Sequence, residues 1–129
     1  MFSRRLFLTS SAVAAVLALA PALAGDAPFN AAAFDEAQKA GKPILIEIHA
    51  TWCPTCKAQA PMLGKLFADP KFKDIVAFKV DFDSQKDLLR QFGARMQSTL
   101  IVFKGRDEVG RSVGDTNPDS IAALLAKAV

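Results

Sequence analysis

The feature that most constrains this chain is a buried-strand pattern that leads directly into two cysteines. The run from Ile44 to Ile48 is almost continuously apolar and rich in β-branched residues, which predicts a central strand covered on both faces. Cys53 and Cys56 follow shortly after it. A helix is predicted to begin at the cysteines and to continue to about Ala68, with a kink at Pro61 because proline lacks the amide hydrogen.

The remaining segments alternate between helix and strand signals. Helices are predicted from Asn30 to about Ala40, from Ser84 to about Phe92 and from Asn117 to about Ala128, and strands over Ile75 to Asp81, Thr99 to Lys104 and Glu108 to Val113. A strand–helix–strand order implies parallel pairing, and the last two strands should form an antiparallel hairpin. The predicted fold class is α/β, a mixed sheet of about four strands with helices on both faces.

Residues 1 to 24 have the parts of a secretory signal. Arg4 and Arg5 precede an uncharged apolar run from Ala12 to Ala20, and a small-residue cleavage pattern follows. The adjacent arginines resemble the twin-arginine export signal. An uncleaved anchor is the alternative, although the run is shorter than the roughly 20 apolar residues of a spanning helix. We expect cleavage, and a mature domain over residues 25–129 in the bacterial periplasm, where a cysteine pair can be oxidised.

The charge balance of the chain depends on this segment. The whole sequence has 16 Lys and Arg against 13 Asp and Glu, a formal charge of +3. Removing Arg4 and Arg5 leaves 14 against 13, or +1. No basic cluster remains to neutralise phosphates, so nucleic acid is not expected as a partner. We expect a monomeric single domain.

The spacing of Cys53 and Cys56 suits thiol–disulfide exchange. Cys53 is predicted at a helix N-terminus, where free amides and the helix dipole favour a thiolate. Cys56, one turn later, can attack a mixed disulfide, and Pro54 stiffens the intervening loop. Three alternatives stay open. A structural disulfide across so small a loop would stabilise little, a zinc site would need two more ligands with only His49 nearby, and two thiolates can carry a soft metal.

From about Phe29 to Val129 the chain resembles the thioredoxin family. The resemblance rests on the strand, Trp52, the Cys-x-x-Cys pair and Pro61. The segment from Ala50 to Cys56 is similar to periplasmic thioredoxin-like proteins of cytochrome c maturation. The stretch from Gly41 to Pro43 resembles the C-terminal domain of the transmembrane disulfide reductase. This implies a thioredoxin fold and an oxidoreductase that reduces disulfide-bonded proteins without a cofactor and is recharged by a membrane-bound electron donor.

Three further positions match the family. Glu47 falls where thioredoxins place a buried acid under the active site, and strand alternation puts it on the same face as His49. A buried carboxyl group keeps its proton more readily than an exposed one and can exchange it with Cys56; a solvated Glu is the alternative. Lys79 matches a family lysine near that acid, and equally fits a surface position. His49, where relatives carry an aromatic residue, can tune the Cys53 thiol or simply fill space.

Ser98 is the largest departure from the family pattern. Thioredoxins have a cis-proline directly before the third strand, facing the cysteines, and Ser98 holds its place by register. Either the Gln97–Ser98 bond is trans and the loop is reshaped, or a cis bond is retained at about 2.5–4 kcal/mol. A third role for Ser98 is to donate a hydrogen bond to the Cys53 sulfur.

In the family, this loop pairs with the substrate backbone and helps to keep metals off the thiols. The predicted substrate contacts are therefore Trp52, Pro54, Gln97 and Ser98. Loss of the proline also permits an alternative function, in which the same fold binds a soft metal or an iron–sulfur cluster through the two cysteines. No metal ligand is assigned for the exchange reaction.

Overall fold

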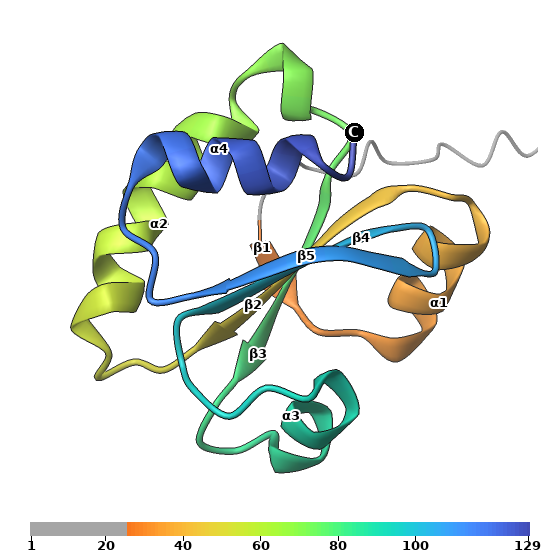
Figure 1. Cartoon of the computed structure of the whole chain (residues 1–129). Coiled ribbons are helices and arrows are strands. Elements are labelled where there is room, and N and C mark those ends of the chain that lie inside the picture. Colours follow the sequence, from red (N-terminus) through yellow and green to blue (C-terminus); the bar gives the residue numbers. More distant parts are fainter. Residues whose placement is uncertain (1–25) are drawn as a thin grey trace, which may run out of the picture.

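The computed structural model describes residues 26–129 (Figure 1). The predicted export signal, with Arg4 and Arg5, lies outside the described residues. The elements in chain order are β1 (Asp26–Pro28), α1 (Ala31–Lys39), β2 (Pro43–His49), α2 (Pro54–Phe67), the short 3-10 helix η1 (Pro70–Phe72), β3 (Val76–Asp81), α3 (Lys86–Phe92), β4 (Thr99–Lys104), β5 (Asp107–Val113) and α4 (Pro118–Ala126). None of the helices in this part of the chain has the length and apolarity needed to cross a bilayer.

The five strands form one mixed sheet in the order β1-β3-β2-β4-β5. The predicted parallel pairing of β2 with β3 and the antiparallel hairpin of β4 with β5 are confirmed. The same rule implied a parallel strand after α3, and this was wrong: β4 pairs antiparallel with β2, because the chain re-enters the sheet at the end where β3 leaves it. The fifth strand, β1, was not predicted. It pairs in parallel with β3 and has only three residues, so it is too short to show an alternating pattern.

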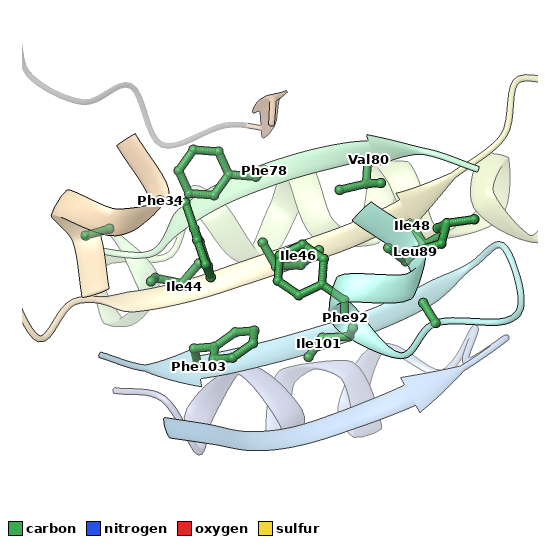
Figure 2. Packing of buried hydrophobic residues seen from close by; sticks show 12 residues of the cluster. Phe34, Ile44, Ile46, Ile48, Phe78, Val80, Leu89, Phe92, Ile101 and Phe103 are labelled. Carbon is green, nitrogen blue, oxygen red and sulfur yellow. The ribbon is translucent and has the colours of Figure 1, made fainter. Parts of the chain in front are cut away.

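Helices cover both faces of the sheet, as predicted. On one face, α1 and α3 pack a core of aromatic and β-branched side chains against the strands (Figure 2). In this core the Phe34 and Phe92 rings meet edge to face, with centroids 5.5 Å apart. On the other face, α2 and α4 pack against Leu45, Leu100 and Val102. The central strand β2 is therefore buried on both sides, which explains its continuous apolar pattern.

Short-range signals set most helix ends. The Asn30 side chain accepts a hydrogen bond from the Ala33 N–H at 2.9 Å and starts α1. Gly93 ends α3 in the left-handed conformation, with φ 62°. The prediction that Ser84 starts α3 was wrong, because Ser84 hydrogen-bonds the Asp81 carboxylate in the preceding turn and the helix begins at Lys86.

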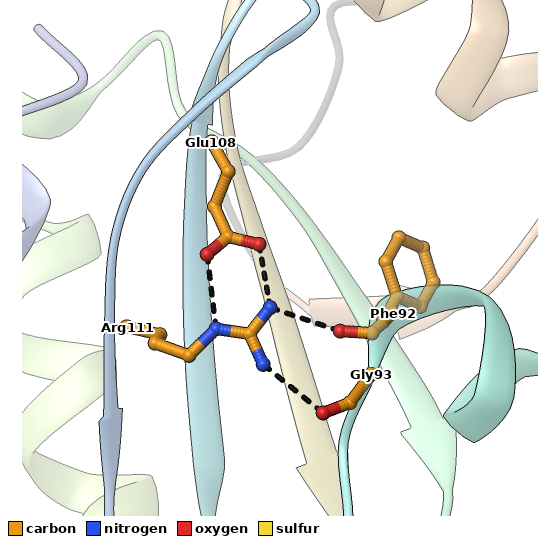
Figure 3. A network of polar contacts seen from close by, with 4 residues as sticks. All are labelled: Phe92, Gly93, Glu108 and Arg111. Atoms are coloured by element: carbon orange, nitrogen blue, oxygen red, sulfur yellow. Dashed lines mark hydrogen bonds and ion pairs between the residues drawn. The ribbon is translucent and has the colours of Figure 1, made fainter.

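A charged side chain ties the edge strand β5 to the end of α3 (Figure 3). Arg111 forms a two-point ion pair with Glu108 and donates to the backbone carbonyls of Phe92 at 2.9 Å and Gly93 at 3.2 Å. Carbonyls at a helix C-terminus lack helical partners and carry partial negative charge, so a guanidinium group suits them. This contact anchors the start of the segment that leads to Ser98.

Candidate active site

Cys53 lies at the N-terminus of α2, as predicted. Its backbone is extended, with φ −81° and ψ 111°, and its sulfur accepts a hydrogen bond from the Cys56 N–H at 3.1 Å. Pro54 takes the first helical position, where an amide hydrogen would have no helical partner. The sulfur therefore receives a backbone donor at the positive end of the helix dipole, an arrangement that stabilises a thiolate.

Cys56 lies behind Cys53 and keeps its proton. Its thiol faces the Ile48 carbonyl at 4.0 Å. Burial raises the pKa of the Cys56 thiol, and its hydrogen bond to Cys53 raises that pKa further, against smaller lowering contributions from the Ala50 and Ser98 backbone amides. Both cysteines are free thiols here. The two sulfurs thus lie in different environments. The Cys53 sulfur accepts a hydrogen bond from a backbone amide, and the Cys56 sulfur belongs to a neutral thiol that donates one.

The side chains around the pair form a shallow cover. Cys53 is only 1% exposed, and Phe82 packs against the cluster of Ala50, Cys53 and Cys56. Trp52 is 53% exposed, and its indole N–H donates to the Asp83 carboxylate at 2.8 Å. Its ring lies edge-on to Phe82, with centroids 6.4 Å apart. Phe82 and Asp83 were not predicted as site residues; the available signal was their place at the end of the strand that neighbours the one leading to the cysteines.

Ser98 faces the cysteines through its backbone. No peptide bond between Asp26 and Val129 is cis, so the trans, reshaped loop is the alternative that holds. Ser98 adopts a left-handed conformation with φ 57°, and its N–H donates to the Ile48 carbonyl at 2.7 Å. A proline has no such hydrogen. The proposed bond from Ser98 to the Cys53 sulfur was wrong, because the hydroxyl donates to the adjacent Gln97 carbonyl at 2.6 Å.

The part of the loop that precedes Ser98 lies at the surface. Gln97 is half-buried, and the neighbouring Met96 side chain is exposed. The Thr99 hydroxyl donates to the Met96 carbonyl at 2.7 Å and closes the turn into β4. Pro54 is also exposed. The structure therefore leaves three of the four predicted substrate contacts accessible or partly accessible, while Ser98 is buried and can act only through its neighbours.

Glu47 is buried, as predicted, with 8% of its surface exposed. It lies on the same face of β2 as Leu45, which packs in the core beneath α2, and its register partner on β3 is Lys79. The matched acid and lysine are thus neighbours on adjacent strands. The distance in sequence between them gave no sign of this; the family match did.

His49 lies at the end of β2, next to a pocket of about 390 Å³ at the sheet edge near β1. It is half-buried and lines this pocket with Lys79, Asp81 and Gln85. The Asp83 N–H donates to Asp81 and lowers the pKa of that carboxyl, and the His49 charge contributes in the same direction. His49 is therefore placed beside charged groups of β3, and its predicted tuning of the Cys53 thiol stays a prediction.

Comparison with known proteins identifies the fold and the chemistry. The thioredoxin family model matches residues 26–127. The chain belongs to the thioredoxin family. Members of the thioredoxin family are thiol–disulfide oxidoreductases, so the predicted fold class and enzyme class are confirmed. Within Asp26 to Val129, no group of three or more His, Cys, Asp or Glu side chains is arranged to hold a metal ion, and the metal-binding alternative stays a prediction from the sequence.

Individual relatives agree with the family assignment. The chain is 37% identical over 101 residues to thioredoxin-2 of Saccharomyces cerevisiae, covering 78% of this chain and 94% of that protein. It is 33% identical over 93 residues to the thioredoxin of Alicyclobacillus acidocaldarius, covering 72% and 88%. The crystal structure of Trxlp from Edwardsiella tarda EIB202 matches with a TM-score of 0.76 and 44% identity, covering 78% of this chain and 98% of that one. The more specific likeness to cytochrome c maturation proteins stays a prediction.

Proposed function

We propose that this thioredoxin-family protein reduces disulfide bonds in exported proteins of the bacterial periplasm. The observation that carries the proposal is the hydrogen bond from the Cys56 N–H to the Cys53 sulfur at the start of α2. It supports Cys53 as the attacking sulfur, because a thiolate is the nucleophile in disulfide exchange. The buried, protonated Cys56 thiol suits the second step, the attack on the mixed disulfide.

The reaction proceeds through one mixed disulfide. The Cys53 thiolate attacks a sulfur of the substrate disulfide; a bond forms between these two sulfurs, and the other substrate sulfur leaves as a thiolate and takes up a proton. Cys56 then loses its proton and attacks the Cys53 sulfur. This forms the Cys53–Cys56 disulfide and releases the second substrate sulfur, which is also protonated. The substrate gains two electrons, both from the two cysteine sulfurs, and two protons. One proton is the one that Cys56 loses, and the other comes from water, because Cys53 enters the reaction as a thiolate.

Glu47 is the proposed acceptor of the Cys56 proton. Its burial on the face of β2 beneath α2 supports this role. In a carboxyl group shielded from water, the affinity for a proton depends strongly on the charge of neighbouring groups such as a thiolate. Lys79, in register on β3, balances the carboxylate when it is ionised. His49 takes the tuning role on the same strand face, beside the pocket that opens next to Lys79.

The substrate chain lies across Trp52, Pro54 and the loop of Gln97 and Ser98. Trp52 is exposed but anchored by Asp83, so it offers a firm apolar surface. Because Cys53 is almost fully covered, a substrate sulfur reaches it only when the covering side chains, Phe82 among them, move aside. This favours a flexible protein segment as substrate over a small rigid disulfide.

The twin-arginine pattern at Arg4 and Arg5 supports the proposed periplasmic location. A reductase in an oxidising compartment must be re-reduced, and a membrane-bound donor is the proposed source of electrons; the protein acts as a monomer. Replacing both arginines by lysine should leave the protein in the cytoplasmic fraction of a bacterial host, while the unchanged chain reaches the periplasm.

The direction of the reaction is tested by the reduction potential of the Cys53–Cys56 pair. Equilibration with glutathione or dithiothreitol buffers, followed by alkylation and mass analysis, measures this potential. A value near the −270 mV typical of thioredoxin supports reduction, and a value near −120 mV, typical of a strong periplasmic oxidant, reverses the proposal.

A further inference from the structure

Gln59 is a buried polar side chain that the exchange reaction does not use. It is 3% exposed, on the inner side of α2. Its side-chain nitrogen donates to the backbone carbonyl of Asp115 at 2.8 Å and to that of Ser98 at 3.3 Å. Both partners are acceptors only, so the NH2 end of the amide must face them. One side chain thus joins α2 to two loops that are distant in sequence.

The same amide completes the hydrogen bonding of Ser98. The Ser98 carbonyl accepts both from Gln59 and from the Gly114 N–H at 3.0 Å, and the Ser98 N–H donates to Ile48 at 2.7 Å. Both backbone groups of Ser98 are therefore held from outside the loop. This matters because φ 57° is unfavourable for any residue except glycine and persists only where the surroundings hold it.

The position of Gln59 connects this loop to the reactive pair. Residues three apart on a helix share a face, so Gln59 follows Cys56 on the same face of α2. The helix that carries both cysteines therefore also holds the Ser98 loop at a set distance. Ser98 has an amide hydrogen and no ring that would fix its φ angle, so the hydrogen bonds to its backbone supply the restraint on this loop.

We propose that Gln59 is a positioning residue for substrate binding, which keeps the Gln97–Ser98 loop beside Cys56 in the conformation that accepts the substrate backbone. The inference rests on the proposed function, since the loop is argued to hold the substrate. Gln59 itself touches neither substrate nor sulfur in this role. If Gln59 had only a structural role, its replacement would lower the stability of the protein and leave KM unchanged. A measurement of KM therefore distinguishes the two roles.

The test compares Gln59→Met with Leu63→Val. Methionine matches glutamine in length and removes the donor; Leu63 packs in the core below the same helix and takes part in none of these hydrogen bonds. For the wild type and both variants, hydrogen exchange of the Ser98 and Gly114 amides, stability in urea, and kcat and KM for reduction of insulin disulfides are measured.

For Gln59→Met we expect Gly114 exchange to quicken about tenfold and KM to rise by about the same factor, as the loss of a hydrogen bond predicts, with kcat little changed. Leu63→Val should lower stability and leave KM unchanged. Unchanged exchange or unchanged KM in Gln59→Met overturns the inference, as does an equal KM rise in Leu63→Val. If the wild type does not reduce insulin, the proposed function fails, and the exchange data alone decide whether Gln59 holds the loop.

Discussion

The Cys53 sulfur and the Cys56 backbone amide are joined by a 3.1 Å hydrogen bond across the first turn of α2. The bond places the two cysteines in unequal positions. One sulfur receives a donor at the helix start, and the other belongs to a buried thiol whose pKa is raised. This asymmetry supports the proposed roles of Cys53 as the attacking cysteine and Cys56 as the resolving cysteine.

Serine variants separate the two steps of exchange. Cys56→Ser keeps the attacking sulfur and removes the resolving one, so we expect it to accumulate a mixed disulfide with a substrate protein. Cys53→Ser removes the nucleophile and should abolish insulin reduction. Intact-mass analysis without reductant detects the adduct, and the wild type serves as the control. Full turnover by either variant would contradict the mechanism.

The raised pKa of Cys56 makes the reduced protein less stable in alkaline solution. The unfolded chain loses this proton near the ordinary value of 9.0, while the folded thiol keeps it to a higher pH. The contribution is therefore fully present below pH 9 and is lost as the pH rises through the folded pKa. Urea unfolding of the reduced protein between pH 7 and 10 measures this loss, and Cys56→Ala should show a smaller one. Parallel pH curves would contradict the assignment.

Glu47→Gln tests the proton acceptor. Glutamine keeps the shape of the side chain but cannot take a proton, so we expect the attack of Cys56 on the mixed disulfide to slow on the order of a hundredfold, as for other general bases. Quenched-flow alkylation follows that step directly. Glu36→Gln, an exposed site on α1, should have no effect. If Cys56 attacked the mixed disulfide at the wild-type rate in Glu47→Gln, Glu47 would have no part in the mechanism.

Ser98→Pro should destabilise this protein, although it would restore the residue that the thioredoxin pattern is expected to have there. Proline cannot reach φ 57° and has no hydrogen for the Ile48 carbonyl. We expect a loss of about 2–4 kcal/mol in unfolding free energy, measured in urea. Ser98→Ala keeps the amide and loses only the hydroxyl bond to Gln97, so it should cost about 1 kcal/mol. Equal stability of Ser98→Pro and the wild type would show that the loop has another accessible conformation.

Asp83→Ala frees the ring of Trp52. Since the chain has one tryptophan, its fluorescence reports on this ring alone. Loss of the bond to the carboxylate should lower the fluorescence anisotropy and raise KM for a protein disulfide a few-fold, in line with a net hydrogen-bond contribution of about 1 kcal/mol. Asp87→Ala, which removes an exposed partner of Arg90 on α3, is the matched control. Unchanged anisotropy in Asp83→Ala would show that packing on Phe82 suffices to hold the ring.

Much of the fold could be predicted because its signals are local. The buried strand β2 shows a continuous apolar run, α2 begins where the cysteines and Pro54 place it, and Gly93 ends α3 through its left-handed backbone. Strand β1 was not predicted because three residues are too few to show the alternation of apolar and polar side chains that marks a strand. The start of α3 was misplaced because Asp81 draws Ser84 into the preceding turn, a competition between two local hydrogen bonds that the sequence does not rank.

The sequence determined the place of the two cysteines, since their spacing puts them one turn apart at a predicted helix start. The roles expected for Glu47 and Ser98 came from the resemblance to the thioredoxin pattern. The hydrogen-bond partners of Ser98, in contrast, could not be predicted from the sequence. Ile48, Gln59 and Gly114 come from three separate segments, and only the packing of α2 and β5 around the sheet brings their donors and acceptors within reach of one residue. Hydrogen bonds act over a few ångströms, so contacts between remote segments are settled by the folded arrangement rather than by the sequence around them.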